Sequence, residues 1–191
     1  MGVLVSDVSG HGTPAAVIMA MTRIVLRTHL SSIISPKEAL EKLNAILCEN
    51  VRTGDFITAF YGVIHLPTRM MTYSSAGHHP SYLINYGAGT TEKLWVDKGF
   101  PLMIKAENPM KEIKVELPGN SKIVLFTDGI TEARNEQGQI FGDKQLVAIL
   151  QEHGKHLTAD KLGPKIMELV NNFTHRTSFV DDYTLVIIDV E

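Results

Sequence analysis

Three strand ends in this sequence carry aspartates that could hold a divalent metal ion. Asp7 follows the apolar run "VLVS", Asp128 follows "KIVLFT", and the pair Asp181-Asp182 directly precedes "YTLVIIDV". If these ends meet, mutual repulsion raises the pKa values of the carboxyl groups unless a cation neutralises them. Mg²⁺ and Mn²⁺ are the ions that carboxylate, carbonyl and water oxygens favour. The pattern therefore predicts a site for one of these hard cations.

Each acid also has a simpler interpretation. Asp128-Gly129 is typical of a turn in which the aspartate hydrogen-bonds its own backbone, and Asp181-Asp182 could be a solvated loop before a strand. The coincidence of three such sites favours the metal hypothesis, and their convergence in space is a prediction.

The elements that must position these acids follow from the periodicity of the sequence. We expect a strand over residues 2 to 6, a turn over 10 to 14 and a helix from Ala15 to about Leu30. Ser35, Pro36 and Glu38 form a capping box that opens a second helix, which runs to about Asn50. Two later helices are expected over about 143 to 153 and, with Thr158 as cap, over 159 to 172.

The middle of the chain is rich in β-branched and aromatic residues, which favour strands. Residues 56 to 66, 70 to 75 and 81 to 86 are expected to form an antiparallel meander. Further strands are expected over 92 to 96, 112 to 117, 122 to 126 and 183 to 190. Strands, then helices, then strands again predict an α+β fold with antiparallel sheets.

Composition narrows the class of protein. The chain has 191 residues, 44% hydrophobic and 20% charged, which fits one globular domain over 1–191. The net charge of −3 is spread without a basic block, so nucleic acid is not the expected partner. Cys48 is the only cysteine, which favours a reducing compartment and a cytoplasmic location. The most apolar run is too short to span a membrane, and no signal peptide is recognised.

Five blocks of this sequence resemble, in order, the SpoIIE-like PPM phosphatases, a family of bacterial metal-dependent phosphoserine and phosphothreonine phosphatases that act in partner-switching pathways. The blocks are "DVSGHG" from Asp7, "FITAFYGV" from Phe56, "SSAGHHPSYLI" from Ser74, "FTDGITEARNEQG" from Phe126 and "DDYTLVIIDV" from Asp181. The resemblance covers essentially the whole chain.

The resemblance implies a four-layer αββα sandwich, two antiparallel sheets flanked by helices, with two Mn²⁺ or Mg²⁺ ions at one end. By motif match, Asp7 would bridge both ions and the backbone carbonyl of Val8 would ligate one. Asp128 and Asp181 would complete the shell of the other, with Asp182 as a secondary candidate. The implied chemistry is hydrolysis by a metal-activated water, without a covalent phosphoenzyme.

The loop after Asp7 carries further candidates. Gly10 and Gly12 permit positive φ and close approach of a phosphate. His11 is interpreted first as a structural residue of the loop, because it does not register with the histidine of the eukaryotic "DGHG" motif; protonation of the leaving group is the alternative. His78-His79 and Cys48 are interpreted as structural, because adjacent residues on a strand face opposite ways and no basic or histidine neighbour activates the thiol.

The sequence departs from the family at its start. Nothing matches the upstream acidic "GGDFYD"-like block that supplies a ligand to the second metal, so we expect an N-terminally truncated domain with one weaker ion site. A missing edge strand would also leave a sheet edge open to association between copies of the chain. The resemblance also implies a sensor domain upstream of this domain in the full-length protein.

Two function classes follow. The first is a protein-serine/threonine phosphatase whose substrate resembles a phosphorylated anti-sigma-factor antagonist, with activity reduced by the truncation. The alternative is a weakly active or inactive phosphatase-like module that binds a partner. A nucleophilic hydrolase built on Ser9 and His11 is disfavoured, because no serine stands in a G-x-S-x-G elbow and the three acids would stay unexplained.

Overall fold

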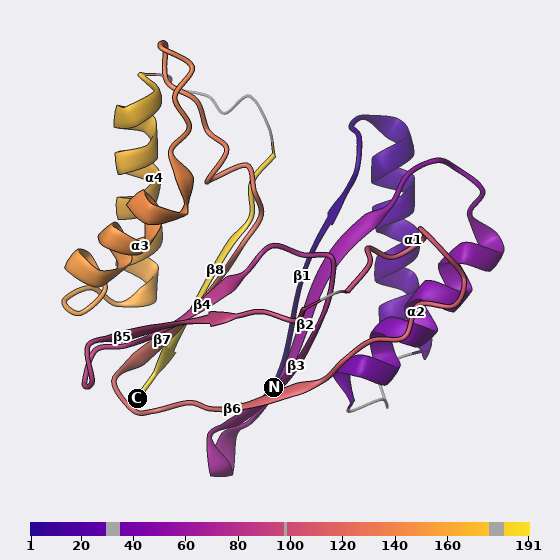
Figure 1. The fold of residues 1–191 in the computed structure, drawn as a ribbon, viewed down its shortest axis with the longest axis horizontal. Helices are drawn as coiled ribbons and strands as arrows, with labels where there is room; N and C mark the ends of the chain where they lie inside the picture. The colour runs from indigo at the N-terminus through magenta and orange to yellow at the C-terminus, as the bar shows by residue number, and fades with distance from the viewer. Residues whose placement is uncertain (30–34, 98, 176–181) are drawn as a thin grey trace. The chain divides into compact units, whose positions relative to one another are not determined.

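The computed structural model describes residues 1–29, 35–97, 99–175 and 182–191, and the chain divides into two compact units. The first unit contains residues 1–78 and 95–116, and the second contains 79–94 and 117–191. Each unit is one antiparallel sheet with one pair of helices (Figure 1). The α+β fold class with two antiparallel sheets and flanking helices is therefore confirmed.

The first unit has the strand order β1-β2-β3-β6, with β1 at an edge. Its strands are β1 (Gly2–Val8), β2 (Ile57–His65), β3 (Met70–Ala76) and β6 (Ile113–Glu116). Its helices are α1 (Thr13–His29) and α2 (Pro36–Asn50), and a 3-10 turn η1 (Leu66–Thr68) joins β2 to β3. The end expected for the first helix, near Leu30, lies outside the described residues.

Both helices of the first unit cover one face of its sheet. Side chains at alternate strand positions, such as Val8, Ile57 and Ala59, pack against Leu40 and Leu43 of α2. Ser35 caps α2 as expected, because its hydroxyl accepts a hydrogen bond from the Glu38 N–H at 3.3 Å.

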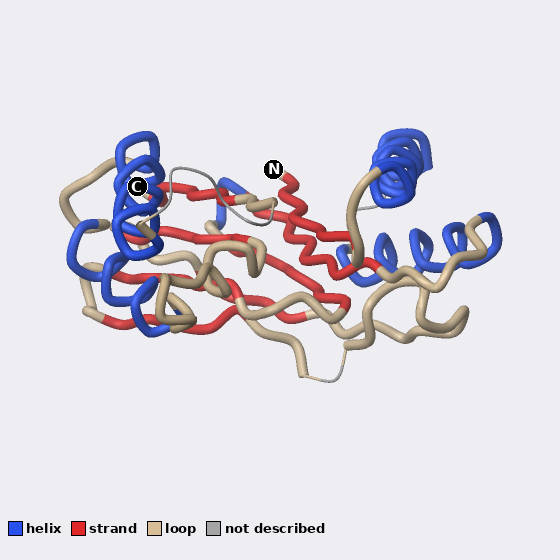
Figure 2. The backbone as a smooth tube through the Cα atoms, turned by 90° about the horizontal axis from the view of Figure 1, so that it is seen from above, coloured by secondary structure: helices blue, strands red, loops and turns tan. Residues whose placement is uncertain are grey.

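The second unit has the strand order β5-β4-β7-β8. Its strands are β4 (Ser81–Asn85), β5 (Thr90–Leu94), β7 (Ser121–Phe126) and β8 (Leu185–Val190), and its helices are α3 (Gly142–His153) and α4 (Ala159–Thr174). Figure 2 shows the helices and strands of each unit along the backbone. The helices pack on the face that carries Val124 and Phe126, with Leu146, Leu150 and Ile166 in the same core.

Two expectations about local structure were wrong. Residues 56 to 86 do not form one meander, because β2 and β3 pair with each other while β4 pairs with β5 and β7 in the other sheet. Thr158 stands at the N-cap position of α4 but makes no capping hydrogen bond through its side chain. The Ala159 N–H is instead bound by the carboxylate of Asp189 from β8, at 2.9 Å.

No helix within the described residues is long and apolar enough to cross a membrane.

Candidate metal centre

Asp7 lies at the end of β1 next to a tightly held loop. It is half-buried and pairs in register with Thr58 of β2. Just beyond it, the Ser9 N–H donates to the Phe56 carbonyl and the Ser9 hydroxyl accepts from the Phe56 N–H, both at 2.9 Å. These bonds fix the loop to the start of β2, and they give the Ser9 hydroxyl a structural role.

The glycines of this loop adopt the conformation that the sequence predicts. Gly10 has φ +86° and Gly12 has φ +80°, in the left-handed region that side chains disfavour. The Gly12 carbonyl then accepts from the Ala16 N–H and begins α1. His11, between the two glycines, is exposed.

The structure adds a carboxylate that the sequence analysis missed. A Cβ placed on Gly10 would lie 3.5 Å from Oδ1 of Asp55, which is half-buried. Asp55 stands just before β2, and because β2 runs antiparallel to β1, the start of one strand meets the end of the other. Asp55 directly precedes the strand that the sequence predicts from residue 56. It is therefore another acid at a strand end, and this position could have identified it as a candidate.

In the second unit, the segments that carry Asp128 and Asp182 lie side by side beyond the paired ends of β7 and β8. The last ladder pair is Phe126 with Leu185. The Thr127 N–H then donates to the Thr184 carbonyl at 3.0 Å, and the Thr127 hydroxyl accepts from the Thr184 N–H at 2.8 Å. Two of the acid-bearing motifs are therefore locked together at one end of this sheet.

Gly129 brings the two backbones into closer contact than a side chain would permit. A Cβ at this position would lie 2.4 Å from the carbonyl oxygen of Asp182, a distance that real Cβ atoms essentially never show. The glycine of the "TDG" motif is thus required by packing, although its φ is not in the left-handed region.

The turn after Asp128 leaves its carboxylate at the surface. The main-chain carbonyl of Asp128 accepts from the Glu132 N–H at 2.7 Å and from the Thr131 hydroxyl at 3.4 Å. The backbone is held by these bonds while the Asp128 side chain is exposed. A rigid backbone with an accessible carboxylate suits a metal ligand.

The predicted ligands divide between the two units. Asp7, Val8, Gly10, His11 and Gly12 belong to the first unit, whereas Asp128 and Asp182 belong to the second. Asp181, the preferred ligand of its pair, lies outside the described residues. No three Asp, Glu, His or Cys side chains form a metal-binding group within the described part of the chain. The centre that would join Asp7 to Asp128 stays a prediction.

The two adjacent histidines have separate surroundings. Nδ1 of His78, which is buried, lies 3.0 Å from the hydroxyl of Thr58, and the ring of His79 packs on Phe126 with the ring centres 4.3 Å apart. These contacts support the structural interpretation of both residues.

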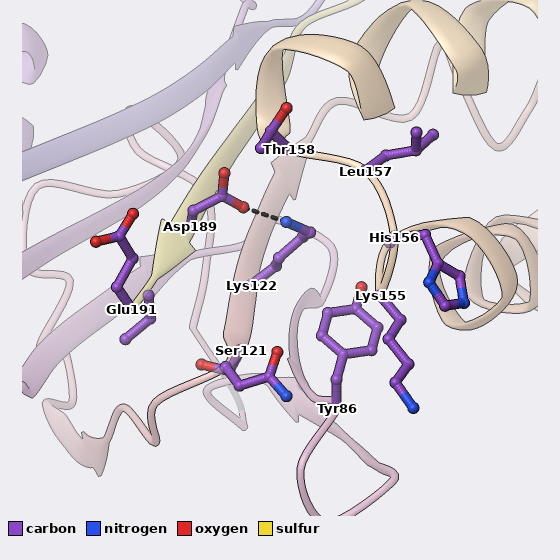
Figure 3. A pocket seen from close by; sticks show the side chains of 12 residues that line it. Tyr86, Ser121, Lys122, Lys155, His156, Leu157, Thr158, Asp189 and Glu191 are labelled. Atoms are coloured by element: carbon purple, nitrogen blue, oxygen red, sulfur yellow. Dashed lines mark hydrogen bonds and ion pairs between the residues drawn. The ribbon is translucent and has the colours of Figure 1, made fainter.

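A pocket of about 400 Å³ lies at the other end of β7, between the start of that strand and the turn that joins α3 to α4. Lys122 in this pocket lies six positions before Asp128, which corresponds to about 20 Å of extended chain. Figure 3 shows Lys122 and Asp189 pointing toward each other, whereas the His156 ring points away from them.

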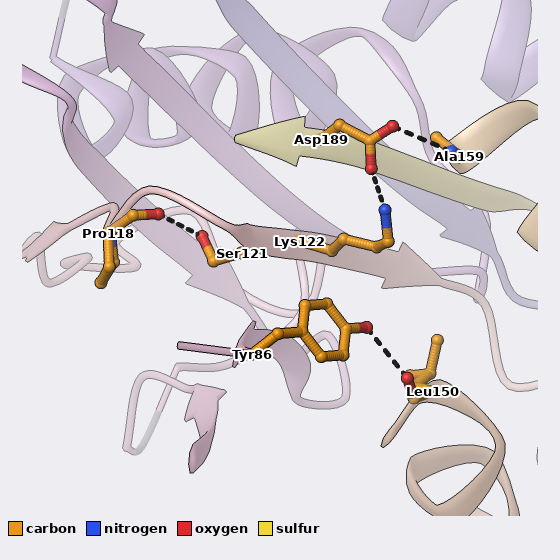
Figure 4. Close-up of polar contacts among 7 residues, drawn as sticks. All are labelled: Tyr86, Pro118, Ser121, Lys122, Leu150, Ala159 and Asp189. Atoms are coloured by element: carbon orange, nitrogen blue, oxygen red, sulfur yellow. Dashed lines mark hydrogen bonds and ion pairs between the residues drawn. The ribbon is translucent and has the colours of Figure 1, made fainter. Parts of the chain in front are cut away.

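The buried lysine of this pocket is neutralised by a carboxylate from the neighbouring strand. Lys122, whose side chain is 8% exposed, forms an ion pair with Oδ1 of Asp189, and Oδ2 accepts from the N–H of Ala159 at the start of α4 (Figure 4). Tyr86 closes the same region by donating to the Leu150 carbonyl at 2.9 Å. The carboxylate of Asp189 thus joins β7, β8 and the start of α4.

Replacing Asp189 with asparagine is expected to lower the free energy of unfolding by about 2 to 4 kcal/mol, because Lys122 would be left buried without a counter-charge. Asparagine keeps an oxygen for the Ala159 N–H, so the change isolates the charge. Urea unfolding measures the effect. The matched control is Glu168→Gln, which removes the partner of Lys165 on the surface of α4 and is expected to cost less than about 0.5 kcal/mol. Equal effects of the two substitutions would contradict the assignment.

The same pair predicts a pH dependence. Burial opposes ionisation of Asp189, but the hydrogen bonds from Lys122 and Ala159, with the charge of Lys122, outweigh it and hold the pKa of Asp189 below its ordinary value of 3.8. The carboxylate therefore stabilises the fold above the unfolded-state pKa, and this contribution is lost as the pH falls through the lower folded-state pKa. The difference in stability between wild type and Asp189→Asn should be constant near pH 6 and shrink below about pH 4.

Comparison with known proteins decides the family. The sequence model of the SpoIIE family, described as Stage II sporulation protein E, matches residues 1–191. The chain belongs to this family. Phosphoserine phosphatase RsbU of Bacillus subtilis (strain 168) is 29% identical over 191 residues, which are 98% of this chain and 55% of RsbU. The chain thus spans about half the length of that relative.

Solved structures show the same fold. The SiaA-PP2C domain of Pseudomonas aeruginosa superposes with a TM-score of 0.88 at 16% identity, over 100% of this chain and 76% of that one. RsbX, solved in complex with magnesium, gives a TM-score of 0.65 at 20% identity, over 96% of this chain and 78% of that one. The phosphatase fold expected from the sequence motifs is therefore confirmed.

Proposed function

We propose that this SpoIIE-family chain is a metal-dependent protein-serine/threonine phosphatase that hydrolyses phosphoserine or phosphothreonine on a protein substrate. The observation that carries the proposal is the close fit of Gly129 against the Asp182 carbonyl, which holds two acid-bearing motifs at one end of a sheet. Membership of the family and the likeness to RsbU, which is named a phosphoserine phosphatase, support the same reaction.

The donors fit a hard divalent ion. In this proposal Asp7, the Val8 carbonyl, Asp128 and Asp181 hold Mn²⁺ or Mg²⁺, with Asp182 beside them. All these donors are oxygen atoms, the type that both ions favour. The exposed carboxylate on a fixed backbone at Asp128 agrees with such a role, and RsbX was solved with magnesium. Bound ions would lower the pKa of a water molecule and offset charge on the phosphoryl oxygens.

The chain's own residues position the reactants. Gly10 and Gly12 adopt positive φ in the loop after Asp7. Because glycine has no side chain, the backbone at these two positions leaves room for a phosphate to approach the loop. Asp55, which stands before β2 and lies beside Gly10, adds a carboxylate next to this loop and is a further candidate for binding a cation. His11 is exposed between the glycines and is the candidate to protonate the leaving oxygen.

The substrate and the context are also proposals. The family resemblance of the sequence motifs is the basis for proposing a phosphorylated anti-sigma-factor antagonist as substrate and an upstream sensor domain as regulator; RsbU, of which this chain spans 55%, is named a phosphoserine phosphatase. A cytoplasmic location agrees with the single cysteine, Cys48. Because β1 is an edge strand, copies of the chain could associate through its unpaired backbone groups.

Phosphate release from a phosphoserine peptide tests the reaction. The chain is expected to release phosphate with Mn²⁺ or Mg²⁺ and to lose this activity in EDTA, with recovery when the ion is restored. No release by folded protein with either ion would favour the alternative of an inactive partner-binding module. Full activity in EDTA would refute metal-dependent hydrolysis.

A further inference from the structure

Thr58 of β2 lies directly opposite Asp7, the acid at the end of β1. The two residues are partners in the antiparallel register of these strands. Directly opposite residues of an antiparallel pair project from the same face of the sheet, with their Cβ atoms about 4.5 to 5.5 Å apart. The next pair along the strands, Val8 and Ile57, belongs to the core on the helix side of the sheet. Because successive side chains of a strand alternate, Asp7 and Thr58 share the opposite face.

A buried histidine holds the hydroxyl of Thr58. Nδ1 of His78 lies 3.0 Å from Oγ1 of Thr58, and His78 is 7% exposed. The main-chain carbonyl of His78 also accepts a hydrogen bond from the Ser75 hydroxyl at 3.4 Å. His78 is therefore held through both its ring and its backbone, and it restricts the Thr58 hydroxyl to one place.

The turn before His78 brings its ring to β2. Gly77 follows β3, has φ +65° and forms a bridge with Ala59, the neighbour of Thr58 in the strand. A Cβ at Gly77 would lie 2.6 Å from Pro101, so any other residue would displace this turn. The backbone conformation and the packing at Gly77 thus fix the point from which His78 reaches Thr58.

The three side chains have complementary hydrogen-bonding groups. Either atom can be the donor between Thr58 and His78, depending on which ring nitrogen carries the proton. An ionised aspartate only accepts hydrogen bonds, whereas a hydroxyl donates one proton and accepts at its oxygen. The order that serves all three groups has Nδ1–H of His78 donating to Thr58, and the Thr58 hydroxyl donating to the Asp7 carboxylate.

We propose that Thr58, held by His78, is a positioning residue whose hydroxyl orients the Asp7 carboxylate as a ligand for Mn²⁺ or Mg²⁺. This role rests on the proposed metal-dependent function and adds to it two residues that are not themselves predicted ligands. Hydrogen-bonding partners of metal ligands typically contribute about 10- to 100-fold to metal affinity. The contact that makes His78 a structural residue therefore also serves the metal centre.

Calorimetric titration with Mn²⁺ tests the role of the Thr58 hydroxyl. Thr58→Val removes the hydroxyl and keeps the branched shape, so it should weaken the tighter Mn²⁺ site at least about 10-fold. Thr58→Ser keeps the hydroxyl and should bind within about 3-fold of wild type. The matched control is Thr22→Val in α1, which removes a buried hydroxyl that donates to the Ile18 carbonyl. Its Mn²⁺ affinity should stay within about 2-fold of wild type, because this hydroxyl bonds only within its own helix.

The ring of His78 gives a second test, which does not depend on the folding of Thr58→Val. Asparagine carries an N–H at the position of Nδ1, whereas leucine has no donor there. His78→Asn should therefore keep Mn²⁺ affinity within about 3-fold of wild type, and His78→Leu should weaken it at least about 10-fold. Thermal unfolding of each variant shows whether it is folded at the temperature of the titration.

The outcomes separate this role from the proposed function. Wild-type affinity in folded Thr58→Val, or an equal loss in Thr58→Ser or Thr22→Val, would overturn the role of the Thr58 hydroxyl. Equal affinities of His78→Asn and His78→Leu would overturn the role of His78. In each of these cases wild type still binds Mn²⁺, so the proposed function stands. Failure of wild type to bind Mn²⁺ would contradict the proposed function and the positioning role together.

Discussion

Replacing Asp128 with asparagine is expected to reduce metal-dependent phosphate release by more than about 100-fold while the fold stays intact. The Asp128 side chain is exposed, and its backbone is held by Glu132 and Thr131 through the main-chain carbonyl, which the substitution preserves. The loss should therefore come from the missing charge on a ligand. Initial rates with a phosphoserine peptide at several Mn²⁺ concentrations measure it, and circular dichroism checks the fold.

The matched control is Glu136→Gln, which removes an exposed negative charge from the segment that follows the same turn. Its activity should stay within about 2-fold of wild type, because a surface charge with no ligand role contributes little. If Asp128→Asn keeps its activity, or if Glu136→Gln loses as much, Asp128 is not a metal ligand.

Gly129→Ala is expected to lower the free energy of unfolding by about 2 to 3 kcal/mol and to reduce phosphate release as well. The added methyl group would lie 2.4 Å from the Asp182 carbonyl, so the segments beyond β7 and β8 must separate. Displacement of the backbone that carries Asp128 and Asp182 would then disturb the predicted site. Thermal unfolding and activity assays of one preparation measure both effects.

Gly163→Ala is the control for this substitution. Gly163 lies within α4, and apart from its chain neighbours and the nearby helix backbone a Cβ there would meet no atom within 4 Å. Alanine favours the helix over glycine, but its Cβ meets the ring of the following Pro164, so this change should alter the free energy of unfolding by less than about 1 kcal/mol and leave activity unchanged. A neutral or stabilising effect of Gly129→Ala would show that the close contact with Asp182 is absent.

The positions of helices and strands could be predicted from the sequence because they depend on local patterns. The apolar run of β7, the β-branched residues of β2 and the Ser35-Pro36 start of α2 all encode their own structure. The pairing of β4 could not be predicted in this way. Strand propensity does not specify a partner, and β4 pairs with β7 nearly forty residues later in the chain.

Contacts between distant residues explain the other differences. The start of α4 is bound by Asp189, thirty residues further along the chain, and not by the neighbouring Thr158. The motif around Asp128 predicted a turn, but only the fold shows that Gly129 packs against Asp182. Asp55 was overlooked because an acid before a strand resembles an ordinary turn residue, and its neighbour Gly10 lies 45 positions earlier.

Calorimetric titration with Mn²⁺ of wild type, Asp7→Asn and Asp128→Asn tests most directly whether acids from both units hold one ion. Wild type is expected to have one tight Mn²⁺ site and a weaker one, and each substitution alone should remove the tight site. Phosphate release should fall in parallel. A tight Mn²⁺ site that persists in either variant would contradict the assignment of Asp7 and Asp128 to a shared metal centre.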